Sequence, residues 1–589
     1  MPAYKAPVED MVYLLGELFD AQGVLVPLCG ENASLDLMAA VLGEAARFCE
    51  DVVHPLNRPG DEEGCHFDAG TVRTPKGVRE AFAAFAENGW VGLSGDPEYG
   101  GQGMPRVLQV LTDEMLSSAN LSFGLYPGLT HGATEAIRHH AGDDLKARYL
   151  PKMVAGTWTG AMDLTEAHAG TDLGLLRTRA EPRDDGSYRI TGTKIFISAG
   201  DHDLAENIIH LVLARLPEAP AGTQGISLFL VPKFLPDADG NPGARNAFAA
   251  GAIEHKMGIK GSPTCVMNFD GATGWLVGEP NRGLAAMFTM MNNERLFVGI
   301  QGLGVAEAAY QGAAAYAGER LQGRGPAGGA GPQPILVHPD VRKNLLTIRA
   351  FTEAGRALAV WTALEMEKAD RHPDAEVRAA ADDLVALMTP VIKAAFSDLG
   401  FEGAVLGQQV FGGHGYIREH GMEQLVRDAR ITQIYEGTNG VQAMDLVGRK
   451  LTMAGGRLPE RFFALVGDFV QVNEGAAGAG EFLAPLRGAL TRLKVTTARL
   501  VDRAAADPAE AGAAATDYLR LFALTALGWM WARMALQALE LGDAAGPRHR
   551  AKLEVARFFM ARILPQTVAL ELALDAGAAS LMRLDADAF

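Results

Sequence analysis

Two short glycine-rich motifs between residues 409 and 450 contain residue types that could do chemistry. The first, GGHG at 412–415, offers a backbone without side-chain bulk whose N–H groups could lie against the phosphates of a cofactor. Glycine spacing alone favours a different interpretation, a tight turn between helices. The second, YEGTNG at 435–440, places Glu436 just before a predicted helix start at Thr438 or Asn439. A carboxylate held there could act as a general base, although a lone glutamate in such a place is more often a solvated helix-end charge.

The bulk composition indicates a folded protein with more than one core. Its 589 residues are too many for a single hydrophobic core, and 48% hydrophobic and 21% charged residues are ordinary for globular proteins. The net charge of −18 argues against a general nucleic-acid binder, which needs a basic surface. A local arginine cluster could still hold a phosphate group.

Cysteine spacing and the first residues bear on compartment and metal binding. Cys29, Cys49, Cys65 and Cys265 lack CxxC spacing, so neither a metal site nor a disulfide framework is predicted, and a reducing compartment is expected. The start of the chain is acidic and has no basic segment before an apolar one, so we expect no targeting peptide and a cytoplasmic location. The most apolar stretch, between Arg520 and Arg533, is too short to span a bilayer.

The order of predicted elements divides the chain into four parts. Helical spacing dominates 1–160, and β-branched and aromatic runs such as YRITGTKIFIS dominate 161–280. Helices return in 281–455 and continue in an additional region, 456–589. Within this order, GRGPAGGAGPQP at 323–334 predicts a flexible connection, and Pro339–Asp340 predicts the start of the next helix. The fold class is therefore α+β, mainly helical, with a strand domain built as a sandwich or barrel.

The motifs closely resemble those of the acyl-CoA dehydrogenase family. RDARITQIYEGTNGVQ contains the family's Y-E-G-T, whose glutamate is the base. DLTEAHAGTD at 163–172, TGTKIFIS at 191–198 and ERLQGR at 319–324 resemble other family motifs, and NNERL at 292–296 resembles the helix on the CoA side. These matches run from about residue 85 to 450.

The resemblance implies an FAD enzyme that introduces an α,β double bond into an acyl-CoA thioester and passes electrons to an electron-transfer flavoprotein. Glu436 would remove the α-proton as hydride leaves Cβ for flavin N5. Its backbone N–H and a flavin hydroxyl would hold the thioester oxygen. The implied fold has an N-terminal helical domain, a middle β-domain, a C-terminal four-helix bundle and an additional C-terminal helical domain.

The resemblance also implies which residues contact FAD. Those of one subunit are Leu164, Thr165, Gly170, Thr171, Phe196 and Ser198, with Thr165 and Ser198 bonded to the isoalloxazine ring. Those of a neighbouring subunit, at the adenine and pyrophosphate end, are Arg320, Gln322, Gln409, Gly412 and Gly413. Thr438 would add a contact near the adenosine half. FAD shared between subunits implies a homodimer or a larger homo-oligomer.

The resemblance also implies substrate-binding positions, and several of the implied site residues have a structural alternative. Asn292 and Arg295 match positions that line the CoA side, and their alternative is an exposed helix face. Without the motif match, Phe196 would be interpreted as a core residue and Arg320 as a solvated helix-end charge. For Thr165 the alternative is a capping box, a poor fit because the box needs Glu or Gln three residues later, where this chain has histidine.

Several positions depart from the common family pattern. Ala167-His168 stand where Pro-Gly is common, Phe196 replaces Trp, Ser198 replaces Thr, Gln322 stands where Thr is common, and Gly440 stands where shorter members carry Gln. The leader PVEDMVYLLGELFD, YPGLTHGA at 126–133 and the long C-terminal region are similar to a long bacterial subgroup. That subgroup contains 3-methylmercaptopropionyl-CoA dehydrogenases and dehydrogenases of fatty acyl-CoAs, so the acyl group stays open.

Two other functions are compatible with the same fold. An acyl-CoA oxidase has a similar layout and hands its electrons to oxygen. A flavin-bearing binding protein of the DNA-damage-response type would carry a basic C-terminal face. Residues 456–589 mix acidic and basic side chains without a basic run, which argues against that function and against nucleic acid as a partner.

Overall fold

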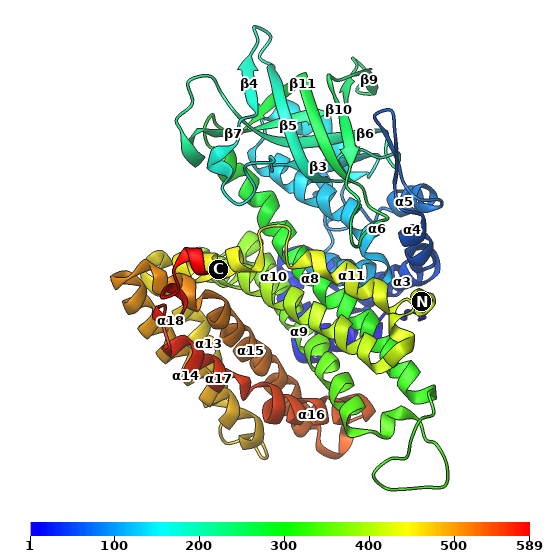
Figure 1. Ribbon diagram of the computed structural model, residues 1–589, viewed down its shortest axis with the longest axis vertical. Coiled ribbons are helices and arrows are strands. Elements are labelled where there is room, and N and C mark those ends of the chain that lie inside the picture. Colours follow the sequence, from blue (N-terminus) through cyan, green and yellow to red (C-terminus); the bar gives the residue numbers. More distant parts are fainter. Residues whose placement is uncertain (1) are drawn as a thin grey trace. The chain divides into compact units, whose positions relative to one another are not determined.

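The computed structural model describes residues 2–589 and separates into two compact units, each of which is described by itself (Figure 1). The first unit joins the residues up to Gly43 to Val298–Phe589, and the second is Glu44–Phe297. Helices α3 (Leu35–Phe48) and α8 (Gly283–Glu319) cross the boundary between them. The expected four-part division of the chain is a finer one and stays a prediction.

The second unit contains the strand domain expected from the sequence. In the described chain its main sheet has seven strands: β3 (Trp158–Asp163), β4 (Arg179–Pro182), β5 (Tyr188–Ser198), β6 (Asn207–Arg215), β7 (Ile226–Pro232), β10 (Phe248–Ile253) and β11 (Thr264–Val277). Strands β5, β4, β6, β7 and β11 pair in a closed circuit, so the sheet is a barrel. Alternating side chains of these strands, such as Ile190, Val212 and Phe229, fill its interior.

Helices and two short hairpins complete this unit. The helices are α4 (Asn57–Glu63), α5 (Val78–Glu87), α6 (Arg106–His140) and α7 (Asp143–Val154). One hairpin, β1 (His66–Asp68) with β2 (Thr71–Arg73), lies in the region predicted to be helical, and the other is β8 (Phe234–Pro236) with β9 (Pro242–Arg245). Each strand of the first hairpin has three residues, too few for a period-two pattern to be recognised in the sequence.

The first unit is helical throughout its named elements. Its helices are α1 (Val8–Tyr13), α2 (Ala21–Cys29), α9 (Pro339–Arg371), α10 (Ala375–Phe411), α11 (Met422–Thr432), α12 (Asn439–Asp445), α13 (Arg457–Val472), α14 (Gly480–Ala506), α15 (Pro508–Leu541), α16 (Pro547–Phe558), α17 (Gln566–Asp575) and α18 (Ala579–Met582). The predicted helix start at Pro339 is confirmed.

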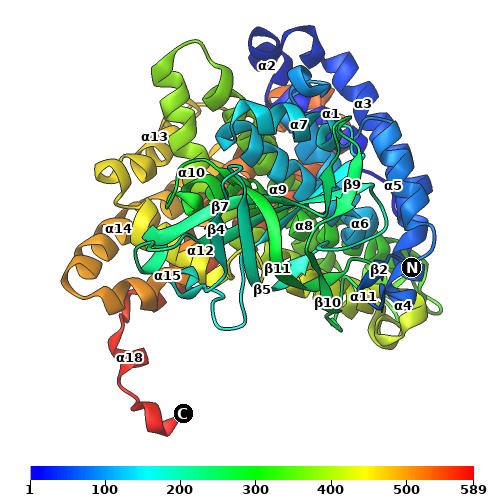
Figure 2. The same ribbon diagram turned by 90° about the horizontal axis from the view of Figure 1, so that it is seen from above.

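Helix α15 is the centre of the additional C-terminal region. It packs against α14 and also against α9, α10 and α12 of the preceding bundle. Two of its tryptophans, Trp529 and Trp531, are fully buried, and the indole N–H of Trp531 donates to the carbonyl of Ala350 on α9 at 2.9 Å. The additional region is therefore continuous with the core of the bundle. Its last residues, around α18, extend away from α14 and α15 (Figure 2).

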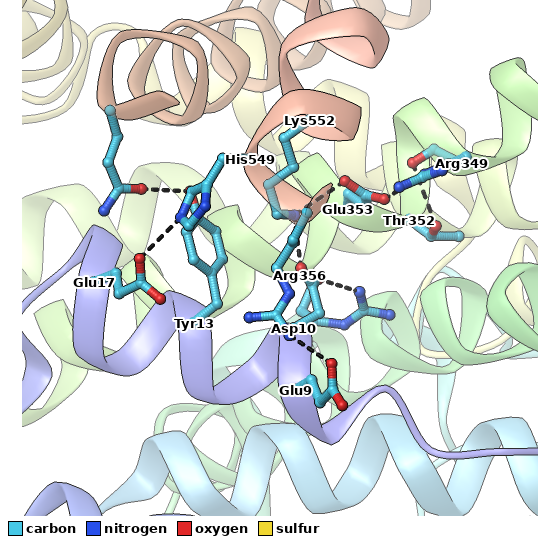
Figure 3. A network of polar contacts seen from close by, with 12 residues as sticks. Glu9, Asp10, Tyr13, Glu17, Arg349, Thr352, Glu353, Arg356, His549 and Lys552 are labelled. Atoms are coloured by element: carbon cyan, nitrogen blue, oxygen red, sulfur yellow. Dashed lines mark hydrogen bonds and ion pairs between the residues drawn. The ribbon is translucent and has the colours of Figure 1, made fainter. Parts of the chain in front are cut away.

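A buried ionic network fastens the N-terminal leader to this unit (Figure 3). Asp10 of α1 accepts from Arg356 of α9 at 2.7 Å and lies 2.6 Å from Lys552 of α16. Lys552 also donates to Glu353 at 3.0 Å, and Arg356 donates to Glu307 at 3.0 Å. Burial alone would raise the pKa of Asp10, but the charges of Lys552 and Arg356 outweigh it and lower that pKa to about 2.

One helical stretch of the first unit is unusually long and apolar. Among residues 2–589, the helical stretch from Ala375 to Tyr416 is long and apolar enough to cross a membrane, yet 72% of its most apolar window is buried inside the protein. The stretch between Arg520 and Arg533 lies within α15, most of whose side chains in this stretch are also buried. Core helices of soluble proteins can be equally long and apolar, so the length and composition of this stretch are weak evidence for a membrane span.

Candidate active site

The loop between α11 and α12 holds Glu436 in an unusual backbone conformation. Glu436 has a φ of 57° and Gly437 has a φ of 83°, so two consecutive residues lie in the left-handed region. For a non-glycine residue this conformation costs of order 1–3 kcal/mol and persists only where the surroundings enforce it. The side chain of Glu436 is half-buried. The loop is therefore built to present one glutamate at a fixed place.

Three contacts within the first unit hold the Glu436 loop in place. The side-chain amide of Gln442 donates to the backbone carbonyl of Glu436 at 3.1 Å. The hydroxyl of Tyr435 donates to the side chain of Gln301 on α8, which is fully buried. The predicted helix start is confirmed, since α12 begins at Asn439 and Thr438 caps it by accepting from the N–H of Val441 at 3.4 Å.

The loop 163–172, expected to contact flavin, is fixed to strand β5. Lys194, which is fully buried, donates to the carbonyl of Leu164 at 2.9 Å and to the carboxylate of Glu166 at 3.0 Å. The carbonyl of Thr165 accepts from the N–H of Ile195 at 2.9 Å. The same loop leaves Gly170 and Thr171 exposed.

Glu166 is the acceptor that organises this loop. It also accepts from the N–H of Arg177 at 2.7 Å and from the N–H and hydroxyl of Thr178 at 2.9 and 2.6 Å. Burial alone would raise the pKa of Glu166, but Lys194 and these donors outweigh it and lower the pKa to about 2. Burial lowers the pKa of Lys194, and Glu166 offsets only part of that effect.

Phe196 lies on a β-bulge beside this loop. Between the pairs Met267–Lys194 and Cys265–Ile197 the register shifts, so Ile195 and Phe196 stand opposite one residue of β11. The bulge gives Phe196 a φ of 61° and leaves its ring 60% exposed. The alternative interpretation of Phe196 as a core residue is therefore wrong. Two positions further along the strand, Ser198 is half-buried.

A cavity of about 490 Å³ lies next to the same loop in the second unit. His168, Gly174, Leu175, Arg177 and Arg215 are among the residues that line it. The guanidinium of Arg215 donates to the carbonyls of Gly174, Leu176, Pro220 and Gly222, so it holds the wall together. Arg177 is exposed and also lines a neighbouring cavity with Arg179. Glu181 and Glu218 also line that neighbouring cavity, so exposed Arg177 is the side chain here that best suits an anionic ligand.

The residues expected to meet the far end of FAD gather in the first unit around the end of α10. Gln409, Gly412 and Gly413 are exposed, and Gly412, which ends the helix, has a φ of 58°. The ring of Tyr316 on α8 stacks on that of Phe411, with 4.1 Å between their centres. The Tyr316 hydroxyl forms a hydrogen bond of 2.8 Å with Nδ1 of His414, so the end of α8 lies beside GGHG.

Arg320 and Gln322 follow directly after α8. Both are exposed, and the segment pairs with 333–335 through bonds from Gln322 N–H to the Gln333 carbonyl and from Ile335 N–H to the Arg320 carbonyl. This pairing joins the two ends of the connection that was expected to be flexible. GGHG forms a 3-10 turn after α10, so the turn interpretation and an exposed cofactor-facing loop describe the same backbone.

Asn292 and Arg295 lie on α8 in the second unit. Asn292 is exposed, which agrees with the alternative of an exposed helix face, and its side-chain oxygen accepts from the guanidinium of Arg295 at 3.3 Å. Arg295 is buried, with its guanidinium 5.6 Å from the ring centre of Phe288, so an exposed helix face is wrong for it.

Sequence reasoning missed the residues that hold the motifs in place. Glu166 and Lys194 are opposite charges inside two quoted motifs, and this could have suggested their pairing. Beside the Glu436 loop, Asn439 accepts from Lys393 and donates to Asp398. Lys393 and Asp398 lie on α10, and no motif marked them.

Four family models match consecutive segments of the chain. They are the acyl-CoA dehydrogenase N-terminal domain at 38–157, the middle domain at 161–272, the C-terminal domain at 281–451, and the acetyl-CoA dehydrogenase C-terminal-like model at 462–585. The 3-methylmercaptopropionyl-CoA dehydrogenase of Ruegeria pomeroyi is 42% identical over 95% of this chain and 96% of its own length.

The chain belongs to the acyl-CoA dehydrogenase family. It is thus a member of a family of FAD-dependent oxidoreductases, and the expected family and fold class are confirmed. A butyryl-CoA dehydrogenase of Syntrophomonas wolfei is 35% identical over 100% of this chain and 99% of its own. A broad-specificity linear acyl-CoA dehydrogenase of Mycobacterium tuberculosis is 33% identical over the full length of both chains.

Solved structures of the family share the fold of the whole chain. ACDH-11 of Caenorhabditis elegans, solved with C11-CoA, has a TM-score of 0.79 at 20% identity and covers 95% of this chain and 91% of its own. An acyl-CoA dehydrogenase of Bacillus anthracis, complexed with FAD, has a TM-score of 0.76 at 21% identity, with 98% and 93% covered. At these identities the likeness concerns the acyl-CoA dehydrogenase fold, including the additional C-terminal region.

Proposed function

We propose that this acyl-CoA dehydrogenase introduces an α,β double bond into an acyl-CoA thioester, with Glu436 as the base that removes the α-proton. The observation that carries the proposal is the loop around Glu436. A non-glycine residue is held there in the left-handed region by Gln442 and by the anchored neighbours of Glu436. It stands at the glutamate of the motif that resembles the family's Y-E-G-T.

The chemistry needs a base at a fixed distance from a weakly acidic C–H bond. Holding the carboxylate still avoids the entropic cost of finding the substrate. A bound substrate that excludes water from a carboxylate makes that carboxylate a stronger base. The backbone N–H of Glu436 would polarise the thioester oxygen and stabilise the enolate-like charge that develops as the proton leaves. When bound, FAD supplies the acceptor for the β-hydride.

The residues expected to hold FAD fit that group. In the second unit the bulge presents the exposed ring of Phe196, and the loop beside it presents Thr165 with its backbone already fixed to β5. In the first unit, exposed Arg320 offers a planar donor fork for a diphosphate, and the backbone at Gly412 and Gly413 is open, with no atom within 4 Å of where a Cβ would stand.

The CoA part of the substrate would use arginine side chains of the second unit. Exposed Arg177, which faces the cavity beside the flavin loop, suits the phosphate groups of CoA, and Asn292 with Arg295 would line the CoA side of α8.

The acyl group proposed is 3-methylmercaptopropionyl or a fatty acyl group. Relatives named for 3-methylmercaptopropionyl-CoA, butyryl-CoA and linear acyl-CoAs all match nearly the whole chain. The thioether substrate differs from a straight chain by one atom, and discrimination between such groups is worth only about 1–3 kcal/mol. An electron-transfer flavoprotein as electron acceptor and a homodimer or larger homo-oligomer belong to the same proposal.

The test is an anaerobic titration of the purified flavoprotein with butyryl-, octanoyl-, palmitoyl- and 3-methylmercaptopropionyl-CoA. The proposal expects one class of thioester to bleach the flavin absorbance. Absence of bleaching by every thioester, with FAD bound, would contradict it. Turnover in air with stoichiometric hydrogen peroxide would instead identify an acyl-CoA oxidase.

A further inference from the structure

The side chain of Asn439 lies between a buried cation and a carboxylate. Its oxygen accepts from the ammonium of Lys393 at 2.8 Å, and its NH₂ group donates to Asp398 at 2.7 Å and to the hydroxyl of Ser397 at 2.9 Å. Lys393 is fully buried on α10. Because the amide oxygen faces the cation and the amide nitrogen faces the anion, the amide has one favourable orientation.

Asp398 joins both ends of the loop that contains Glu436. One oxygen of its carboxylate accepts from Asn439 at 2.7 Å and from the side-chain amide of Gln433 at 2.6 Å. The backbone N–H of Asn439 also donates to the carbonyl of Gln433 at 3.1 Å. The strained residue and the glycine after it therefore lie in a segment whose two ends are fastened to the same group on α10.

The chemical nature of this contact points to positioning rather than to general stability. Replacing a whole buried ion pair by apolar side chains often leaves stability unchanged, so the presence of such a pair is weak evidence for a stabilising role. The advantage of buried charged groups is directional: hydrogen bonds to charged groups are short and fix geometry. Such precision is useful beside a base that must meet one C–H bond.

We propose that Asn439, clamped between Lys393 and Asp398, is a positioning residue that holds the Glu436 loop in its proton-abstracting conformation. It acts on the rate of α-proton removal and leaves the binding of acyl-CoA unchanged. This inference rests on the proposed function.

The test uses the full-length holoprotein and anaerobic stopped-flow reduction of its flavin by butyryl-CoA. Asn439→Leu is close in size and removes the polar contacts of the amide with Lys393, Asp398 and Ser397. Because a displacement of about 1 Å at a reacting group can lower a rate by about 10²-fold, a fall of this order in the limiting rate is expected, with an unchanged substrate dissociation constant. The kinetic isotope effect with α-deuterated butyryl-CoA should rise, because cleavage of the α-C–H bond becomes more rate-limiting.

Two further variants make the result decisive. Thr389→Val is the matched control, since Thr389 is a buried residue of α10 whose hydroxyl bonds within its own helix, and it should reduce flavin at the wild-type rate. Asp398→Asn keeps the shape of the clamp and removes its charge, and it should lower the limiting rate in the same direction. It decides the matter if Asn439→Leu does not accumulate as holoprotein.

The outcomes separate this inference from the proposed function. A wild-type limiting rate in Asn439→Leu or, in its place, Asp398→Asn overturns the inference, provided that Glu436→Gln is inactive. A weakened substrate affinity with an unchanged limiting rate also overturns it. A wild-type rate in Glu436→Gln contradicts the proposed function itself.

Discussion

The ammonium of Lys194 donates to the carboxylate of Glu166 at 3.0 Å, and this buried pair joins the two sequence motifs expected to contact flavin. Lys194 belongs to TGTKIFIS and Glu166 to DLTEAHAGTD. The pair, with the bonds from Lys194 to Leu164 and from Ile195 to Thr165, makes the loop and the bulged strand one surface.

Replacing Glu166 should therefore destabilise the protein in a pH-dependent way. Glu166→Gln leaves Lys194 as a buried charge with a lost partner, which typically costs about 3–5 kcal/mol. Since the folded-state pKa of Glu166 is lowered to about 2, its contribution is present above its unfolded pKa of about 4.5 and is lost as pH falls toward 2. Urea unfolding at pH 7 and pH 3.5 measures this, and a variant as stable as wild type at pH 7 would contradict it.

Alanine substitutions at Gly412 and Gly413 distinguish the effect of backbone strain from the effect of cofactor contact. Gly412→Ala introduces a side chain at a φ of 58°, which should destabilise the protein by about 1 kcal/mol. Gly413 has no positive φ and open space where a Cβ would stand, so Gly413→Ala should leave thermal stability of the apoprotein unchanged.

The cofactor is the second readout for the same pair. Both substitutions should weaken FAD retention, because each adds a methyl group to the surface proposed to meet the diphosphate. Fluorescence titration of apoprotein with FAD measures the dissociation constants. Wild-type FAD affinity in Gly413→Ala would remove this loop from the proposed site.

The leader should contribute to stability through Asp10. Asp10→Asn removes a carboxylate that lies between Arg356 and Lys552, so two buried cations lose a counter-charge and the free energy of unfolding should fall by about 3–5 kcal/mol. The neighbouring Glu9 is the control: its pair with Arg548 is on the surface, and Glu9→Gln should change stability by less than about 1 kcal/mol. Equal stability of the two variants in urea unfolding would contradict the importance assigned to the buried network.

The sequence predicted the strand domain and the surrounding helices, but not the contacts that hold the expected site segments in place. The start of α12 at Asn439 follows from a local signal, the capping threonine. The exposure of Phe196 does not, because it depends on a bulge created by pairing with β11, far along the chain. The same holds for Asp398 and Lys393, which are ordinary helix residues until the fold brings Asn439 against them.

If Glu436 removes the α-proton, the rate of flavin reduction should fall steeply in Glu436→Gln. The variant keeps the size of the side chain and its polar character but removes the base. With saturating acyl-CoA under anaerobic conditions, we expect a limiting rate about 10²–10⁴-fold below that of wild type, with FAD still bound. Flavin reduction at the wild-type rate in Glu436→Gln would contradict it.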